Sequence, residues 1–338
     1  MTATESMADR ARLVDIDDIR AAAERLRGVA IRTPLIAWGP PDRAAFLKAE
    51  SLQPIGAFKL RGAYNAVATL APDERARGVI TYSSGNHAQG VARAARLLGV
   101  GAVVVMPSDA PAIKRERVAA DGAQIVVVGT ASDERQQVAE SIAAERGLAI
   151  IPPFDDDRII AGQGTVGLEI VEDLPDVAIV LVPIGGGGLA SGVATAVKAL
   201  RPEAQVVGVE PELAADAKAS LAAGEIVRWP AEAVSRTIAD GTRTQSLGER
   251  TFAHLRANLD AIVTVTEEEI AAAVRLASER TRLVVEPSGA LSIAALAFHA
   301  SELGLDPAAG PVVAVVSGGN VDPDRYLELL GSSVPPER

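Results

Sequence analysis

Short runs of β-branched and aliphatic residues recur along the chain, separated by longer stretches with apolar residues every three or four positions. Short, continuous apolar runs bounded by polar residues or glycine are typical of strands buried on both faces of a parallel sheet. The pattern predicts strands at Val79–Tyr82, Ala102–Met106, Gln124–Val128, Ala149–Ile151, Ala178–Val182, Val206–Glu210, Ala261–Val265 and Val312–Val316.

The stretches between these runs have the spacing of amphipathic helices. The clearest are Asp133–Arg146, Leu189–Leu200, Glu267–Glu279 and Gly289–Leu303. An earlier helix is marked at both ends, because Asp15 can cap its start with Asp18 three residues on, and Gly28 can end it. Alternating strands and helices predict parallel sheets with helical crossovers. The predicted strands form an earlier and a later group of four, which favours two sheets.

Composition narrows the possible partners. Of 338 residues, 48% are hydrophobic but only 3% aromatic, so the core must be aliphatic. The net charge of −11 argues against nucleic acid, which needs basic patches. Cysteine is absent, which excludes disulfides and thiolate metal sites.

Met1–Arg12 lacks the apolar core of a signal peptide, and no apolar stretch reaches the ~18 residues of a membrane span. A cytoplasmic protein without membrane contact is expected.

Four consecutive glycines, Gly185 to Gly188, follow the apolar run Ile179–Pro183 and precede the helix predicted from Leu189. Glycine repeats cost chain entropy, so their position between a strand and a helix needs a reason. Free backbone N–H groups at a helix N-terminus bind phosphate, and glycine allows the phosphate to approach closely. A flexible turn is the alternative, but the strand–glycine–helix order favours a phosphate site.

A polar turn, Ser83-Ser84-Gly85-Asn86-His87, follows the predicted strand Val79–Tyr82 and opens a helix. Backbone N–H groups at this place suit a carboxylate ligand. An ordinary helix-capping loop is the alternative for this turn taken alone.

Lys59 is the candidate covalent anchor. Phe58 and Leu60 flank it, and the turn Pro54-Ile55-Gly56 leads into a helix-favouring stretch. A lysine amine becomes reactive when apolar surroundings exclude water and make its proton easy to lose.

The segment Leu47–Asn65 resembles the cofactor-lysine segment of the fold-type II pyridoxal-phosphate (PLP) enzymes, the tryptophan-synthase-β-like group. Further segments match its threonine/serine dehydratase and serine racemase branch: Ser83–Gly90, Ile160–Thr165, Gly185–Gly188, Thr237–Gly241, Glu286–Gly289 and Val316–Asn320. The resemblance implies an α/β fold of two domains, with parallel or mixed sheets flanked by helices. Residues 1–74 plus 156–338 would form the large PLP-binding domain and residues 75–155 a small inserted domain. PLP would lie in the cleft between them, and a homodimer is the family expectation.

The resemblance also implies roles for individual residues. Lys59 would bind PLP covalently and, once released, act as the base at Cα of the substrate, with Ser84 a second catalytic group on the opposite face of the cofactor. Further cofactor-binding residues would be Phe58, Asn86, Gly185, Gly186, Gly187, Gly188, Gly241, Glu286 and Ser317. The substrate carboxylate would be bound by Ser83, Ser84, Gly85, Asn86 and His87, with His87 ordering the loop rather than serving as a base.

Glu210-Pro211-Glu212-Leu213-Ala214-Ala215-Asp216 resembles a divalent-cation site of serine racemases and some dehydratases. The Glu210 and Asp216 carboxylates and the Ala214 carbonyl would supply three hard oxygen ligands, which suit Mg²⁺ or Ca²⁺. The alternative is a solvated acidic helix start.

The expected reaction is PLP-dependent β-elimination, which converts L-serine, L-threonine or a related small β-hydroxy amino acid to a 2-oxo acid and ammonia. A serine racemase with dehydratase side activity is one alternative. A 3-hydroxyaspartate dehydratase is another, because Arg135 could bind the additional carboxylate. A non-catalytic PLP-binding protein is the alternative outside enzymes.

Overall fold

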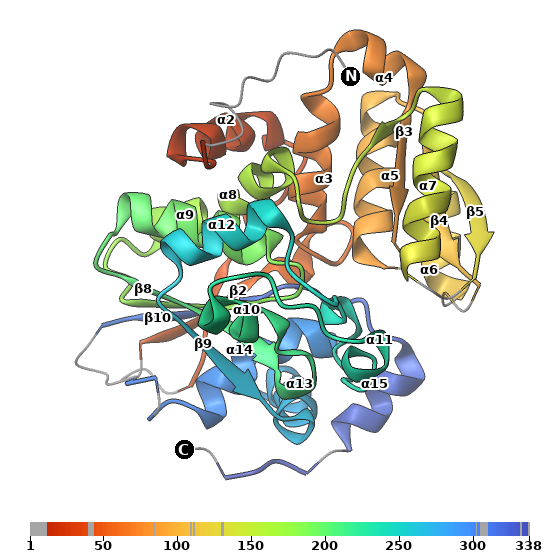
Figure 1. Cartoon of the computed structure of the whole chain (residues 1–338). Coiled ribbons are helices and arrows are strands. Elements are labelled where there is room, and N and C mark those ends of the chain that lie inside the picture. The colour runs from red at the N-terminus through yellow and green to blue at the C-terminus, as the bar shows by residue number, and fades with distance from the viewer. Residues whose placement is uncertain are drawn as a thin grey trace.

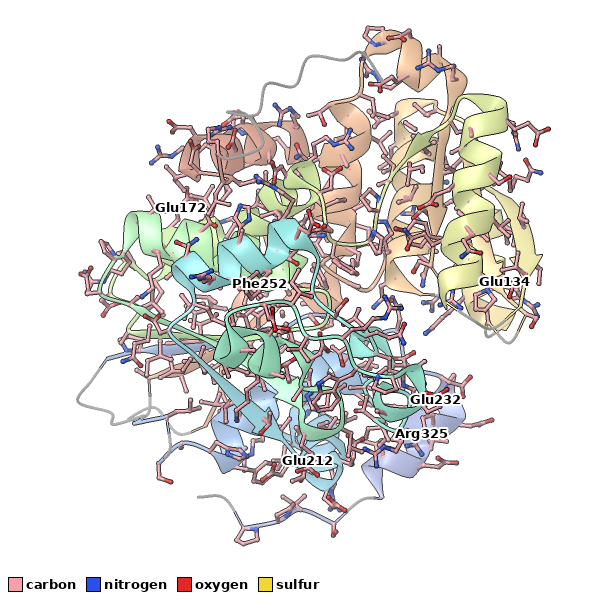
Figure 2. The ribbon with its side chains drawn as sticks, in the orientation of Figure 1. Glu134, Glu172, Glu212, Glu232, Phe252 and Arg325 are labelled. Atoms are coloured by element: carbon pink, nitrogen blue, oxygen red, sulfur yellow. The ribbon has the colours of Figure 1, made fainter. Side chains whose placement is uncertain are left out.

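The computed structural model describes residues 12–39, 44–83, 85–108, 110, 112–129, 132–301, 303–304, 310–331 and 333–336. Two separate sheets organise the chain (Figure 1). Helices pack against both of them, and charged side chains such as Glu134, Glu172 and Arg325 lie on the exposed outer surface (Figure 2).

The larger sheet has six strands in the order β1-β2-β10-β7-β8-β9. They are β1 (Leu35–Ala37), β2 (Ala45–Ala49), β10 (Val312–Val316), β7 (Ile179–Pro183), β8 (Gln205–Pro211) and β9 (Ala261–Val265). Neighbouring strands are parallel except β1 and β2, which pair antiparallel. Strand β10, which follows the other five strands in sequence, therefore lies in the middle of the sheet.

The smaller sheet has four parallel strands in the order β5-β4-β3-β6. They are β5 (Gln124–Val128), β4 (Ala102–Pro107), β3 (Val79–Tyr82) and β6 (Ala149–Ile150). This sheet contains all four strands of the earlier predicted group.

The helices of the N-terminal half are α2 (Ile16–Leu26), η1 (Glu50–Leu52), α3 (Lys59–Ala68), α4 (Pro72–Arg77), α5 (Asn86–Leu98), α6 (Ala112–Ala120) and α7 (Ser132–Arg146). Those that follow are α8 (Asp157–Asp173), α9 (Gly188–Leu200), η2 (Glu212–Ala214), α10 (Asp216–Ala223), α11 (Ala231–Val234), η3 (Asp240–Thr242), α12 (Glu249–Asn258), α13 (Glu267–Thr281), α14 (Pro287–Phe298) and α15 (Pro323–Leu330).

Both faces of the six-stranded sheet are buried. On one face Leu181 and Ala314 pack with α13, α14 and α15, and on the other Val180 and Val313 pack with α8, α9 and α12. Alternate residues of each strand thus enter different cores, which explains why the strands are continuously apolar.

All eight predicted strands are confirmed, with end shifts of one residue at most. The start of α2 is also confirmed: Asp15 and Asp18 form a reciprocal capping box, and Gly28 has a φ of +73° after the helix ends. The expectation of four strands in the later sheet was wrong, because β1 and β2 extend it to six. Within the described ranges, no helix is both long and apolar enough to cross a membrane.

The predicted domain boundaries at residues 75 and 155 stay a prediction. Helix α3 precedes the first boundary, yet Ala63 and Val67 share a hydrophobic cluster with Val79 and Val91 of the small-sheet region. The segment between Lys59 and Leu70 therefore packs against both predicted parts.

Helices α8 and α9 approach so closely that glycine is needed at their contact. A Cβ on Gly192 would overlap the Ile160 carbonyl oxygen and the Gly164 nitrogen. Both neighbours are backbone atoms and cannot move without displacing a helix.

We expect Gly192→Ala to lower the free energy of unfolding by about 1–3 kcal/mol, as overpacked cores do, despite alanine's better helix propensity. Urea denaturation measures the change. Gly101→Ala is the control, because its Cβ would meet no atom within 4 Å. Equal stability of the two variants would show that the helices can separate freely.

Candidate active site

The backbone around Lys59 is fixed by the segment that follows β10. The Phe58 N–H donates to the Ser317 carbonyl at 3.0 Å, and Ala57 forms an isolated antiparallel bridge with Gly318. Gly56 has a φ of +74°, which glycine adopts without strain, so the chain can turn there before α3 begins at Lys59. The end of the central strand thus positions the first turn of α3.

The Lys59 side chain is half-buried at the cavity. Its Nζ donates a 2.7 Å hydrogen bond to the Pro153 carbonyl and lies 5.2 Å from the centre of the Phe58 ring. Burial lowers the pKa of Lys59 from 10.5 to about 8. The amine can therefore lose its proton near neutral pH, as a covalent anchor or a base must.

The four glycines connect β7 to α9 as predicted. Gly187 precedes the helix with a φ of +92°, and a Cβ there would lie 2.8 Å from the Thr251 Cβ. A Cβ on Gly186 would overlap the Phe154 ring. Both positions therefore exclude side chains, and a backbone without side chains at a helix N-terminus is what close approach of an anion requires.

The polar turn follows β3, and α5 begins at Asn86. The Asn86 Nδ2 donates to Glu286 at 2.6 Å, and its Oδ1 accepts from the Asn320 Nδ2 at 2.8 Å. These bonds connect the start of α5 to the large-sheet side of the site. Ser84 lies outside the described residues, so its predicted role stays a prediction.

His87 is the second residue of α5 and lines the cavity. Its side chain is buried, and Nε2 is 3.1 Å from the Ile151 carbonyl oxygen. Burial and the nearby Lys59 charge lower the pKa of His87 to about 3. The imidazole is therefore neutral, in keeping with the predicted loop-ordering role.

Gly241, Glu286 and Ser317 are three further predicted cofactor-binding residues. The Ser317 hydroxyl donates to the Ser288 carbonyl at 3.3 Å, and the Ser288 hydroxyl accepts from the Gly241 N–H at 2.7 Å. Burial and the nearby Asp240 charge raise the pKa of Glu286 to about 7.

A cavity of about 740 Å³ brings these groups together. Every predicted cofactor or substrate residue that the structure describes lines it: Phe58, Lys59, Ser83, Gly85, Asn86, His87, Gly185, Gly186, Gly187, Gly188, Gly241, Glu286 and Ser317. Arg135, suggested from sequence as a carboxylate partner, also lines it.

Other lining residues were not predicted. Pro153 and Phe154 follow β6, and Lys114 of α6 forms a 3.0 Å ion pair with Asp240. Pro153 and Phe154 could have been found from their place after a predicted strand, since ligands bind beyond the carboxyl ends of parallel strands. Lys114 carries no comparable sequence signal.

The candidate metal residues lie apart from the lining of this cavity. Glu210 accepts from the Ala217 N–H at 3.0 Å and the Lys218 N–H at 2.8 Å, whereas both buried oxygens of Asp216 lack a hydrogen-bond partner among the described residues. Burial raises the pKa of Asp216 to about 7, and burial together with the Asp216 charge raises that of Glu210 to about 8.

The cavity chemistry fits PLP. A desolvated lysine can bind an aldehyde covalently, a glycine loop at a helix N-terminus can bind a phosphate, and the Ser317 hydroxyl can meet a ring nitrogen. All three groups face the same cavity.

The model of the family described as "Pyridoxal-phosphate dependent enzyme" matches residues 26–318. The L-threo-3-hydroxyaspartate ammonia-lyase of Saccharomyces cerevisiae is 42% identical over 93% of this chain and 95% of its own. The serine racemase of Schizosaccharomyces pombe is 38% identical over 96% and 99%. The solved structure of maize serine racemase, 38% identical, covers 94% of this chain and 97% of its own with a TM-score of 0.87. The chain belongs to the family of PLP-dependent enzymes of fold type II.

Proposed function

We propose that the protein is a PLP-dependent ammonia-lyase that converts L-serine, L-threonine or a closely related β-hydroxy amino acid to a 2-oxo acid and ammonia. The observation that carries this proposal is the Lys59 amine, whose pKa is lowered to about 8 in a cavity that also contains the glycine loop. The names of the relatives support the same reaction class.

Bound PLP would supply the electron sink that stabilises negative charge at the substrate Cα. Lys59 would anchor it and, once released, take the Cα proton. Gly185 to Gly188 would bind its phosphate through backbone N–H groups. The Ser317 hydroxyl, whose bond to Ser288 is long, can rotate to donate to the ring nitrogen. A neutral partner there leaves the nitrogen unprotonated, which favours loss of a β-hydroxyl over transamination.

The loop Ser83 to His87 would bind the substrate carboxylate, and Ser84 would be the group that acts from the face opposite Lys59. Racemisation needs such a second proton donor, since inversion at Cα exchanges protons on both faces. We therefore infer that racemisation of serine accompanies β-elimination as a side activity.

A second candidate substrate is 3-hydroxyaspartate. Arg135 lines the cavity, and a guanidinium can bind a carboxylate through two parallel hydrogen bonds. Relatives from Saccharomyces cerevisiae and Pseudomonas bear the name L-threo-3-hydroxyaspartate ammonia-lyase.

A substrate panel tests the proposal. Purified protein with PLP should release 2-oxo acid from L-serine, L-threonine or L-threo-3-hydroxyaspartate, and chiral analysis of the recovered amino acid measures racemisation. Arg135→Lys should raise the KM for hydroxyaspartate about tenfold or more and change that for L-serine little, because one bidentate contact is lost. Absence of 2-oxo acid with every substrate would contradict the ammonia-lyase assignment.

We further propose that Mg²⁺ or Ca²⁺ binds Glu210, the Ala214 carbonyl and Asp216. The two unpartnered oxygens of the buried Asp216 support this site, because a buried carboxylate normally has a partner. The described residues include no cluster of three or more His, Cys, Asp or Glu suited to a metal, so the backbone carbonyl and water would complete the coordination.

Metal removal should destabilise the protein more at pH 8 than at pH 6. Without a cation, the folded carboxylates keep their protons up to about pH 7 and 8, whereas the unfolded ones release them near their ordinary values of 3.8 and 4.5. The contribution of Glu210 and Asp216 to the free energy of unfolding therefore falls as the pH rises from their unfolded to their folded pKa values. A bound cation offsets this loss, because it binds only the folded protein. Thermal melts with chelator or Mg²⁺ measure this.

Asp216→Asn should remove the Mg²⁺ response and weaken the pH dependence, because burial alone still raises the pKa of Glu210. Glu212→Gln is the matched control, because Glu212 is exposed on the same segment (Figure 2). A Mg²⁺ response that survives Asp216→Asn would place the cation elsewhere. The homodimer, which light scattering can test, and the cytoplasmic location stay predictions.

A further inference from the structure

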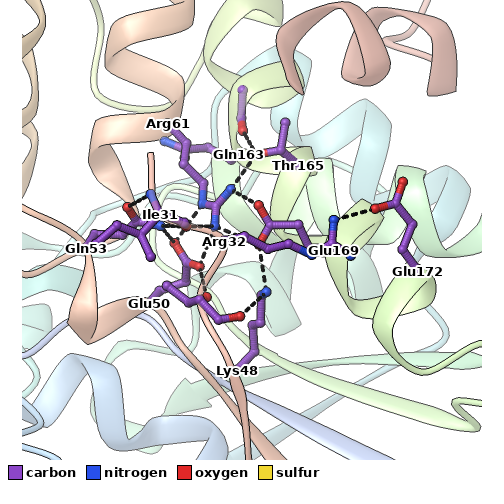
Figure 3. A network of polar contacts seen from close by, with 12 residues as sticks. Ile31, Arg32, Lys48, Glu50, Gln53, Arg61, Gln163, Thr165, Glu169 and Glu172 are labelled. Atoms are coloured by element: carbon purple, nitrogen blue, oxygen red, sulfur yellow. Dashed lines mark hydrogen bonds and ion pairs between the residues drawn. The ribbon is translucent and has the colours of Figure 1, made fainter. Parts of the chain in front are cut away.

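Four charged side chains are buried behind the helix that begins at Lys59. Lys48, Glu50 and Arg61 are at most 1% exposed, and the Glu169 side chain is 13% exposed. We call these four residues the buried ion network (Figure 3). They come from β2, η1, α3 and α8, so the network joins four elements.

Arg61 lies at the centre of the network and contacts both carboxylates with paired hydrogen bonds. Its Nε and Nη2 each donate to Glu50 at 2.8 Å. Its Nη1 and Nη2 donate to Glu169 at 2.6 and 2.9 Å. Nη1 also reaches the Thr165 hydroxyl at 3.1 Å, and Nη2 the Ile31 carbonyl at 3.1 Å.

Lys48 is the second cation of the network, and Glu50 makes further contacts. Lys48 donates to Glu169 at 2.6 Å and to the Thr33 carbonyl at 2.7 Å. Glu50 also accepts from the Thr33 hydroxyl at 2.6 Å and from Gln53 at 3.1 Å. Two cations thus face two anions. Burial alone would raise the pKa of Glu50, but attraction to Arg61 outweighs it, so the carboxylate stays ionised.

Residues of the network lie on both sides of Lys59 in the sequence. Glu50 precedes the turn that leads to Lys59, and Arg61 follows Lys59 by two residues in the first turn of α3. The first turn of α3 needs support from other elements. The N-cap residue, Phe58, has a helical backbone conformation, and its side chain makes no capping hydrogen bond among the described residues. Arg61 therefore ties the start of the turn and the start of α3 to α8.

The contact between α3 and α8 continues one residue further. The Gly62 N–H donates to the Gln163 side chain at 3.2 Å. A Cβ on Gly162 would lie 2.6 Å from the Gly62 Cα, so the two backbones are in direct contact. A shift of α3 along α8 would move the backbone of Lys59, whose amine donates to the Pro153 carbonyl.

We propose that Arg61 is a positioning residue: by clamping Glu50 and Glu169 it fixes the first turn of α3 and thereby the place of the Lys59 amine in the cavity. This inference rests on the proposed role of Lys59 as cofactor anchor. Arg61 is not among the described residues that line the cavity, so it acts through Lys59.

Arg61→Lys tests the proposal, because lysine keeps the charge but cannot make paired bonds to two carboxylates. Arg32→Lys is the matched control. Arg32 also binds carboxylates of α8, Glu172 and Asp173, but it is half exposed and this pairing does not involve α3 (Figure 3). Glu169→Gln is a second variant, which loses one clamp while Arg61 keeps its pair with Glu50.

Each holoenzyme is compared with wild type by four measurements: thermal midpoint, half-saturating PLP concentration, pH midpoint of the visible band of lysine-bound cofactor, and kcat against KM. We expect Arg61→Lys to fold, to need about tenfold more PLP and to lose about tenfold or more in kcat at little-changed KM, because displaced reacting groups lower the rate steeply. The pH midpoint of the band should also move. Glu169→Gln should change the same quantities less, and Arg32→Lys none.

If Arg61→Lys is folded and matches Arg32→Lys in band midpoint, PLP requirement and kcat, the positioning role is refuted. If it does not fold, Glu169→Gln decides by the same measurements. A wild-type protein that takes up no PLP overturns the proposed function, and this inference with it.

Discussion

Replacing Lys59 with alanine should lower kcat for 2-oxo acid release by at least about a thousandfold, because a single amine serves as both covalent anchor and proton acceptor at Cα. The protein should remain folded, since the Lys59 side chain contributes one hydrogen bond, to Pro153, and one ring contact, with Phe58. Steady-state assays with saturating PLP measure the loss.

Lys198→Ala is the control, because Lys198 forms its ion pair with Asp260, whereas Lys59 faces the cavity. Borohydride reduction followed by peptide mapping should place the cofactor on Lys59. A label on Lys48, which is buried in the ion network, or on Lys114 would show that the anchor had been misassigned.

The second large effect is expected at Gly187. Gly187→Ala should weaken PLP binding about tenfold or more, because the new Cβ would lie 2.8 Å from Thr251 and displace the N–H groups that precede α9. Equilibrium titration of the visible band measures the affinity.

Gly224→Ala separates the steric effect from backbone strain. Gly224 has a φ of +75°, close to the +92° of Gly187, but a Cβ there would meet nothing within 4 Å. Both variants carry the strain of positive φ, so both should lose some stability. If their PLP affinities fall equally, the glycine loop is not the phosphate site.

The later strands could be predicted because both of their faces are buried. Val312–Val316 and Ile179–Pro183 are apolar at every position, since one set of side chains faces α14 and the other faces α9. Burial of both faces produces a signal that needs no knowledge of the partner strand.

Strand β2 escaped prediction for a related reason. Strand β2 contains Lys48, a residue type that normally marks a solvent-facing position. Glu50 comes directly after the end of the strand. Arg61, in the next helix, neutralises the buried Glu50, and Glu169, far along the chain, neutralises the buried Lys48. A local pattern cannot reveal a charge balanced by a residue more than a hundred positions away, as Lys48 is by Glu169.

Among the residues that line the cavity, the glycines and Lys59 could be predicted from the sequence more readily than the others. Gly185 to Gly188 stand out because few other purposes require four glycines before a helix. Lys114 carries no such signal in the sequence, and it becomes part of the cavity only in the folded chain. The roles assigned to the individual lining residues stay predictions.

The position of β10 has a consequence for how the protein is made. Strand β10 pairs with β2 on one side and β7 on the other, yet of the six strands of this sheet it is the last to be translated. Until then, both neighbours expose unpaired backbone edges, which invite association with other chains. The Ser317 carbonyl that supports Phe58 also arrives with this segment. A nascent chain therefore cannot assemble this cavity before β10 has been translated, and truncations that remove β10 should yield aggregates rather than a smaller enzyme.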